Sequence, residues 1–201
     1  MFRLYDFLPS GNGYKIRLLL TQLGIPFERI ELNILKGETR TPAFLAKNPN
    51  GHIPVLEIGP GKVLSESNAI LFYLSEGTPF LPSDTWERSQ VLQWLFFEQY
   101  SHEPYIATSR FWISILGQAD KYREAIKQKR EPGYAALTLM EKHLTHHTFL
   151  VGECYTIADI GLFAYTHVAD EGGFELTKFP AIQAWLERVQ AQPQHISITQ
   201  G

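Results

Sequence analysis

Small polar residues between a predicted strand and a predicted helix are the first place where this chain could do chemistry. Residues 8–15 read Leu-Pro-Ser-Gly-Asn-Gly-Tyr-Lys, after an aromatic-rich strand at 2–7 and before an apolar-periodic helix at 13–23. A helix N-terminus presents free backbone N–H groups and the positive end of the macrodipole, so this turn favours an anion. We expect Ser10 or Asn12 to hold a thiolate there, although both residue types are also ordinary helix caps.

A thiolate needs such help because a free thiol has a pKa of about 8.5 and stays mostly protonated at neutral pH. Lowering that pKa by about two units takes roughly 2.7 kcal/mol. One charge-assisted hydrogen bond contributes about 1.5–3 kcal/mol, and a helix N-terminus adds about 0.3–1 kcal/mol. A hydroxyl donated by Ser10 and the helix dipole are therefore sufficient, and the Asn12 amide is an alternative donor.

The first 77 residues predict a mixed α/β domain with the order βαβαββα. A strand, a helix and a strand within about thirty residues form a βαβ unit, whose crossover is right-handed and whose strands are parallel. The short second helix begins after a threonine cap, and a Gly-Pro-Gly turn joins the last two strands. The predicted elements lie at 2–7, 13–23, 26–33, 42–47, 54–56, 62–64 and 68–76.

Residues 78–86 predict a linker, because prolines interrupt them and the strand signals end there. An all-helical domain is predicted over 87–201. We expect Pro104 to bend its first tract or to lie at a break in it, and Pro132 to interrupt its second, since proline removes a backbone donor. The predicted helical tracts lie at 86–116, 121–144, from 156 and from 180 to about 193, followed by a loose polar tail.

Composition excludes several classes of protein. The formal net charge of −3 gives no basic field, so we expect neither a nucleic acid nor a membrane surface as partner. The single Cys154, expected to be packed, rules out an internal disulfide framework and suits a reducing cytoplasm. The spacing of His143, His146 and His147 could ligate a metal, but no carboxylate or cysteine partner is apparent, so we predict no metal site. The turn does not match the Gly-x-Gly-x-x-Gly fingerprint of dinucleotide-binding proteins, since Ile16 stands at the position of the third glycine.

Four motifs, in matching order and spacing, resemble the cytosolic glutathione S-transferases. They are the Ser-Gly-Asn turn at 10–12, Asn-Pro-x-Gly-x-Ile-Pro at 48–54, Glu-Ser-x-Ala-Ile at 66–70 and Thr-Ile-Ala-Asp at 156–159. The resemblance covers essentially the whole chain and implies a thioredoxin-like domain followed by a helical bundle, with glutathione as cosubstrate. The first tyrosine, Tyr5, falls within the predicted strand, so the serine-using theta/zeta-like bacterial branch fits better than the tyrosine-using one.

The resemblance also implies roles for particular residues. A cis Pro54 would leave the Ile53 backbone to pair with the cysteinyl backbone of glutathione, and Glu66 and Ser67 would meet its γ-glutamyl ammonium and carboxylate. His52 would meet the glycyl carboxylate, unless it is a solvated loop residue. The residues expected to contact glutathione are Ser10, Asn12, Lys36, His52, Ile53, Pro54, Glu66 and Ser67.

The resemblance further implies a small hydrophobic electrophile in a pocket between the domains, a homodimer and a role in detoxification. The residues expected to line that pocket are Leu8, Tyr105, Thr108, Phe111 and Trp112. Two alternatives keep the fold. One is a glutathione-dependent disulfide reductase or peroxidase, which needs no protein cysteine if two glutathiones bind in turn, and the other is a non-catalytic binding protein.

Overall fold

The structure, a computed structural model, describes residues 1–200 and divides into two compact units. One unit comprises residues 77–192, and the other comprises residues 1–76 together with the tail from Pro193. We expected this tail to belong to the helical domain and to be loose. It instead contacts the first helix, because the Tyr14 hydroxyl donates to the Ile196 carbonyl at 2.7 Å and Arg17 donates to the Ile198 carbonyl at 3.1 Å.

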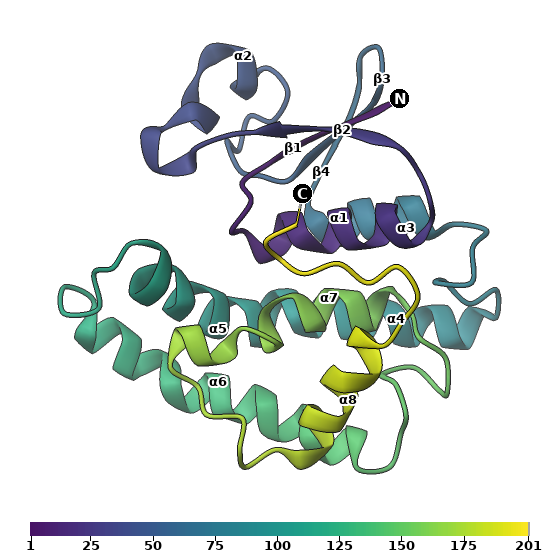
Figure 1. Cartoon of the computed structure of the whole chain (residues 1–201), viewed down its shortest axis with the longest axis vertical. Coiled ribbons are helices and arrows are strands. Elements are labelled where there is room, and N and C mark those ends of the chain that lie inside the picture. The colour runs from purple at the N-terminus through teal and green to yellow at the C-terminus, as the bar shows by residue number, and fades with distance from the viewer. Residues whose placement is uncertain (201) are drawn as a thin grey trace. The chain divides into compact units, whose positions relative to one another are not determined.

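The first unit confirms the predicted order βαβαββα. Its elements are β1 (Phe2–Asp6), α1 (Gly11–Gln22), β2 (Phe27–Glu31), α2 (Pro42–Leu45), β3 (Val55–Gly59), β4 (Lys62–Ser65) and α3 (Ser67–Ser75), with 3₁₀ turns at Ile34–Lys36 and Glu38–Arg40. The sheet order is β2-β1-β3-β4, with β1 and β2 parallel and the other pairs antiparallel. In Figure 1, α1 and α3 lie side by side on one face of this sheet, and α2 lies beyond the other face.

Helix α1 forms the centre of this unit. Its residues from Gly13 to Leu20 are all buried, including two that are basic. The helix begins at Gly11, two residues earlier than the apolar pattern predicts, because Ser10 caps it. Helix α3 likewise begins one residue earlier than predicted, at Ser67.

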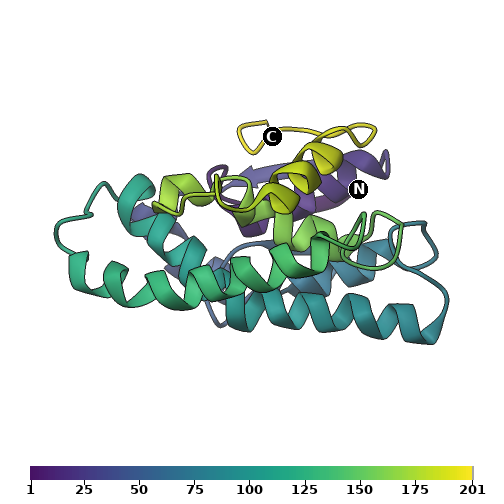
Figure 2. The ribbon, with the colours of Figure 1, turned by 90° about the horizontal axis from the view of Figure 1, so that it is seen from below.

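The second unit is all helical, as predicted. Its helices are α4 (Thr85–Phe97), α5 (Glu103–Arg110), α6 (Arg123–Leu144), α7 (Ile157–Thr166) and α8 (Pro180–Gln190), with π-helical turns at Glu98–His102 and Phe111–Ile115 and a 3₁₀ turn at Ala169–Gly172. Every residue of α7 is buried, and α4, α5 and α8 pack against it. Helix α6 runs alongside the tract formed by α4 and α5 (Figures 1 and 2).

The two prolines expected to disturb helices behave differently. Pro104 lies in the first turn of α5, directly after a π-helical turn, so the predicted break occurs there. Pro132 was wrongly expected to interrupt its tract, because α6 continues through it. Burial of the following turns, at Ala136 and Leu137, offsets the lost hydrogen bond. Gly133 is needed beside it because a Cβ there would lie 2.4 Å from the Phe174 ring.

Among residues 1–200, no group of three or more His, Cys, Asp or Glu side chains is placed to hold a metal ion. His143 and His147 stack with ring centroids 4.1 Å apart. Cys154 is exposed, contrary to expectation, because it lies in a tight turn that bridges back to Val151. Across the described helices, none combines the length and the apolar character that a membrane span requires.

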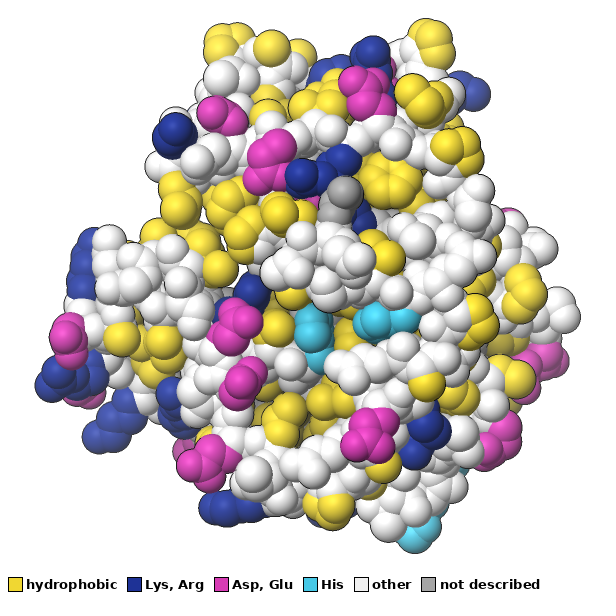
Figure 3. Space-filling model, viewed as in Figure 1, with side chains coloured by type: hydrophobic (Ala, Val, Ile, Leu, Met, Phe, Trp, Pro, Cys, Tyr) yellow, Lys and Arg dark blue, Asp and Glu magenta, His cyan; other side chains and the backbone are white. Residues whose placement is uncertain are grey.

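Charged side chains of both signs are interspersed on the surface. On the face drawn in Figure 3, Lys and Arg side chains lie beside Asp and Glu side chains in both units. This mixture agrees with the balance of 18 basic and 21 acidic residues in the chain.

Candidate functional site

Ser10 is the N-cap residue of α1. Its backbone is extended, with φ −73° and ψ 125°, and its Oγ accepts a hydrogen bond from the Gly13 amide at 3.3 Å. A hydroxyl that accepts one hydrogen bond still carries its own proton, which it can donate to a second partner. The two interpretations of Ser10, as a helix cap and as a donor to a bound anion, are therefore compatible in one geometry.

A buried ion pair holds the turn between β1 and α1. Arg17 Nε donates to Asp6 Oδ2 at 2.9 Å, with both side chains fully buried, and Arg17 Nη2 donates to the Leu8 carbonyl at 2.7 Å. Burial raises the pKa of Asp6 to about 6, and the positive charge of Arg17 opposes that rise. A Cβ at Gly13 would lie only 1.5 Å from Asp6 Oδ1, so the position next to this carboxylate excludes any side chain. The backbone before Ser10 is thus fixed by groups that the turn itself does not contain.

Lys15 is a site residue that the sequence did not reveal. It is fully buried, and its Nζ donates to Asn12 Oδ1 at 2.8 Å and to Ser67 Oγ at 3.2 Å. The Ser67 hydroxyl also donates to Asn12 Oδ1 at 3.2 Å. The structure therefore joins the starts of α1 and α3 through one network of side chains. The available sequence signal was two basic residues beside Ile16 in an otherwise apolar stretch, and that spacing does not say which way they point.

The start of α3 combines an uncommon backbone conformation with the absence, in the part of the chain that the structure describes, of a side-chain cap from Glu66. Glu66 has φ 69°, an uncommon value for a residue with a side chain, and its own side chain makes no capping hydrogen bond within the described residues. Such a conformation costs about 1–3 kcal/mol and is found most often at ligand sites. Ser67 is the first helical residue, and its side chain points to Lys15 and Asn12. The Glu66 side chain is exposed, and the Ser67 side chain is buried.

The loop before β3 contains the predicted cis peptide bond, between Ile53 and Pro54. Asn48 shapes this loop, because its amide nitrogen donates to the His52 carbonyl at 2.8 Å and its Oδ1 accepts from the Asn50 amide at 3.1 Å. The His52 side chain is exposed, while Pro54 is buried and Ile53 is half-buried. The loop thus presents its imidazole to solvent and keeps its proline within the fold.

The remaining predicted residues are placed as follows. Lys36 is exposed in a 3₁₀ turn, and its contact with glutathione stays a prediction. In the helical unit, Lys129 Nζ lies 5.5 Å from the ring centroids of both Tyr105 and Trp112, so these two aromatic side chains share a face of the α5 tract. Trp112 also stacks on Tyr122 at 4.8 Å. Leu8, Thr108 and Phe111 are half-buried, and their contact with an electrophile stays a prediction.

The arrangement in the first unit is suited to an anion. Two helix N-termini, a buried ammonium group, a hydroxyl and an amide come together within one hydrogen-bonded network. Each of these groups stabilises negative charge more than it stabilises a neutral group.

Two family profiles match the chain and together account for most of it. The profile described as "Glutathione S-transferase, N-terminal domain" matches residues 1–76. The profile described as "Glutathione S-transferase, C-terminal domain" matches residues 94–193.

Similar proteins of known structure or description match over almost the full length. The chain is 33% identical over 200 residues to the disulfide-bond oxidoreductase YfcG of Escherichia coli, a match that covers 96% of this chain and 92% of that protein. It is 55% identical to a glutathione S-transferase from Pseudomonas fluorescens, with a TM-score of 0.97 and coverage of 99% of both chains. A further family member from Pseudomonas fluorescens, solved with two glutathione bound, is 28% identical, with a TM-score of 0.83 and coverage of 96% of this chain and 89% of that one.

Proposed function

This chain belongs to the glutathione S-transferase family, and we propose that it is a glutathione transferase that activates glutathione as a thiolate for addition to small hydrophobic electrophiles. The observation that carries the proposal is the network at the starts of α1 and α3, where the buried Lys15 donates to Asn12 and Ser67, in the helix that Ser10 caps. A reducing cytoplasm, which keeps glutathione as the free thiol, is the proposed setting.

Each part of glutathione has a proposed partner in the first unit. The sulfur lies at the start of α1, within reach of the Ser10 hydroxyl and the Asn12 amide. The cysteinyl backbone pairs with the Ile53 backbone next to β3, as an added strand does. The γ-glutamyl carboxylate meets the N-terminus of α3 at Ser67, and its ammonium meets Glu66. His52 and Lys36, whose side chains are exposed, are proposed for the glycyl carboxylate.

The proposed reaction has two steps. The bound thiol gives its proton to solvent, and the resulting thiolate is held by the donors at the start of α1. Its sulfur then forms a bond to the electrophilic carbon, while the leaving group of an aryl halide departs as halide with the bonding electron pair. The protein's part is to hold the thiolate and to orient it, which is why the donors at Ser10 and Asn12 matter most.

Substitution of the two donors tests the proposal. We expect Ser10→Ala or Asn12→Ala to lower conjugation of a generic aryl halide at least tenfold, because each removes a donor worth about 1.5 kcal/mol or more to a charged partner. Circular dichroism should show an intact fold. Ser83→Ala, an exposed serine outside the first unit, is the matched control. Full activity in both single variants and in their double variant would overturn the proposal, and a loss confined to one variant would assign the sulfur to that residue.

A second candidate function, glutathione-dependent disulfide reduction, is favoured by the description of the Escherichia coli relative and by the two glutathione in one neighbour. The thiolate would attack one sulfur of a disulfide and release the other as a thiolate, and a second glutathione would then form glutathione disulfide. This chemistry needs no protein cysteine, and Cys154 lies exposed in the helical unit.

A panel of substrates separates the candidates. Turnover of an aryl halide or an isothiocyanate supports transfer, and turnover of a mixed disulfide or a hydroperoxide supports the reductase or peroxidase. Calorimetric binding of glutathione without turnover of any of these substrates would identify a non-catalytic binding protein instead.

We also propose a homodimer formed through an exposed apolar patch on α4 and the turn after it. Trp86, Leu92, Phe96 and Tyr100 make up this patch, and Phe96 and Tyr100 are 72% and 83% exposed. Leu92, Phe96 and Tyr100 follow one another at intervals of four residues, so they lie along one side of the helix. Contiguous exposed apolar surface of this kind marks protein interfaces, and a second copy of the chain is the partner we assign to it.

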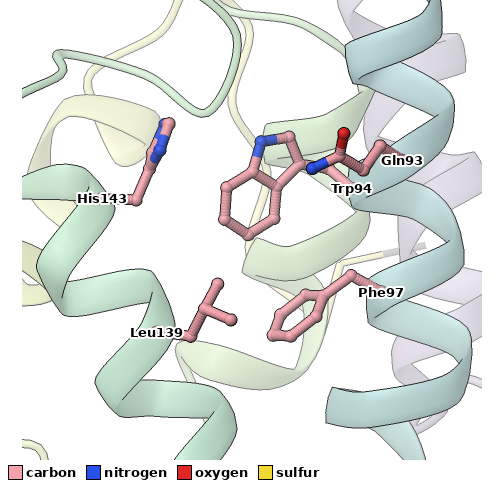
Figure 4. Close-up of a pocket in the computed structure, with 5 residues that line it drawn as sticks. All are labelled: Gln93, Trp94, Phe97, Leu139 and His143. Atoms are coloured by element: carbon pink, nitrogen blue, oxygen red, sulfur yellow. The ribbon is translucent and has the colours of Figure 1, made fainter.

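A pocket of about 420 Å³ also opens between α4 and α6 (Figure 4). Its lining residues come from α4 and α6 and are Gln93, Trp94, Phe97, Leu139 and His143. Light scattering on the purified protein should give twice the mass of the chain, and Phe96→Glu should give a monomer. Leu35→Glu, which alters an exposed leucine outside the patch, should leave the dimer intact. A monomeric wild-type protein would refute this part of the proposal.

A further inference from the structure

The side chain of Lys15 is placed where a cation acts on two of the groups assigned to glutathione. Its ammonium donates to Asn12 Oδ1 at 2.8 Å and to Ser67 Oγ at 3.2 Å, and the whole side chain is inaccessible to solvent. We propose that Lys15 is a positioning residue, which orients the Asn12 amide toward the sulfur and adds positive charge to the site that receives the γ-glutamyl carboxylate. This inference rests on the proposed function and names a residue that the motifs of the chain do not include.

The orientation of the Asn12 amide follows from the chemistry of its partners. An ammonium group has three donors and no acceptor, so it can face only the oxygen of an amide and never its nitrogen. The Ser67 hydroxyl donates to the same oxygen at 3.2 Å. Two donors therefore hold Oδ1 toward Lys15 and α3, and the amide N–H₂ group is directed to the other side of the side chain. An amide held in this way offers its N–H to a thiolate at little cost in side-chain entropy.

The charge of Lys15 acts more strongly at this position than it would at the surface. A side chain shielded from water sits in a medium of lower effective dielectric, where attraction to an anion at a given distance is larger. The ammonium lies between the N-termini of α1 and α3, and each N-terminus is the positive end of its helix dipole. Three sources of positive potential therefore reinforce one another where the thiolate and the γ-glutamyl carboxylate are proposed to bind.

The other charged groups of the surrounding elements are placed differently. Asp6 of β1 and Arg17 of α1 form the buried pair that holds the turn. Glu66, directly before α3, has an exposed side chain. Lys15 is thus a charged side chain that hydrogen-bonds to both Asn12 and Ser67.

The first test replaces Lys15 with a neutral side chain of similar length. The apparent pKa of the bound glutathione thiol is measured from the ultraviolet absorbance of the thiolate as pH is varied, and glutathione affinity is measured by calorimetry. We expect Lys15→Met to raise that pKa by about one unit and so to form about tenfold less thiolate at pH values below it. Lys15→Arg keeps the charge and should recover part of the loss. Lys62→Met, which removes an exposed lysine from β4 of the same unit, should match the wild type.

The second test does not require a Lys15 variant to fold. Asn12→Asp keeps an oxygen facing the ammonium but removes the amide donor, so the new carboxylate should pair with Lys15. We expect the melting temperature to hold or to rise while thiolate formation falls at least tenfold. A lowered melting temperature, or undiminished thiolate, would show that the ammonium does not orient this side chain.

A double-mutant cycle then separates positioning from a purely local structural role. If Lys15 acts through Asn12, the losses in Lys15→Met and Asn12→Ala will not add in the double variant. Additive losses would overturn the positioning role. The proposed function fails on its own if the wild-type protein forms no bound thiolate. The role of Lys15 alone fails if the wild-type protein and folded Lys15→Met form that thiolate equally.

Discussion

The start of α7 has an acidic residue in its first turn, whereas the first turns of α1 and α3, as the structure describes them, have none, and we propose that these two helix starts bind a ligand. At α7, Asp159 lies in the first turn and accepts four hydrogen bonds, from the amides of Leu150 and Thr156, from the Thr156 hydroxyl and from Trp185 Nε1, at 2.9–3.3 Å. The Thr156 hydroxyl accepts from the Ala158 amide at 3.2 Å. This helix start therefore carries its own buried anion and its own cap.

The starts of α1 and α3 have the opposite balance of charge. The first turns of both helices, as the structure describes them, contain no acidic residue, and Lys15 supplies a buried cation instead. Ser10 caps one backbone amide, and Glu66 caps none in the described chain. Because a helix N-terminus attracts negative charge, the sign of the nearby side chain decides its use. We infer that the carboxylate of Asp159 makes the start of α7 structural, and we propose that the cation of Lys15 makes the starts of α1 and α3 an anion site.

The largest expected effect is on stability, at the start of α7. Asp159→Ala leaves three buried N–H donors, from Leu150, Thr156 and Trp185, without their shared acceptor. We expect the free energy of unfolding to fall by about 3 kcal/mol or more, because each unsatisfied buried group costs about 1–3 kcal/mol. Urea denaturation measures the loss, and Glu187→Ala, an exposed acid of α8, is the control. An equal loss of unfolding free energy in Asp159→Ala and Glu187→Ala would contradict the structural role assigned to the start of α7.

The pH dependence of stability tests the charge at the same position. Burial raises the pKa of Asp159 to about 6, with its hydrogen bonds opposing the rise, so the folded protein holds this proton more tightly than the unfolded chain does. The stability that the protonated Asp159 contributes is therefore fully present below about pH 4. It is lost as pH rises through 6, by up to about 3 kcal/mol. We expect the wild type to lose stability relative to Asp159→Asn between pH 4 and 6. Parallel urea midpoints across that range would contradict this expectation.

Placing an acidic residue at the start of α3 should lower the affinity for glutathione. Ser67→Asp places a carboxylate beside the Lys15 ammonium, which lies 3.2 Å from the present hydroxyl. We expect the affinity for glutathione to fall at least tenfold, or about 1.4 kcal/mol, because the new charge competes with the γ-glutamyl carboxylate. The melting temperature should not fall, since the acid is paired and lies at a helix N-terminus. The neutral variant Ser67→Asn should bind glutathione more tightly than Ser67→Asp, and the reverse order would contradict the anion site.

The smallest expected effect is at the cap of α7. Thr156→Ala removes the hydroxyl that accepts from Ala158 and should lower the free energy of unfolding by about 1 kcal/mol, the usual cost of a lost cap. Glutathione turnover per folded molecule should stay the same, because this helix start is structural. A thermal melt like that of the wild type, or a selective loss of turnover, would contradict that assignment.

Several parts of the fold could be predicted from local pattern. The βαβαββα order and the all-helical second half agree with the structure, and each depends on residues close together in the chain, so the sequence contains the interactions that produce it. The cis bond before Pro54, which the family resemblance implied, is also present. The interruption at Pro132 was wrong because burial of neighbouring turns, which is a tertiary effect, outweighed a local preference.

The candidate site divides in the same way. Ser10 and Asn12 could be proposed from the sequence because a turn made of small polar residues before an apolar helix has a recognisable composition. Arg17 and Lys15 were missed because an isolated basic residue in a helix normally faces solvent. Their roles depend on the Asp6 carboxylate of β1 and on Ser67, which is 52 positions beyond Lys15.

The sequence by itself determined that a polar turn opens α1 and that a threonine and an aspartate close the start of α7, because caps act over three or four residues. Only the tertiary structure decided that Lys15 joins Asn12 to Ser67 and that the tail from Pro193 supplies acceptors to Tyr14 and Arg17. The physical reason is that burying a charge or a hydroxyl requires partners from distant segments, and the packing of the helices and the sheet brings those partners within reach.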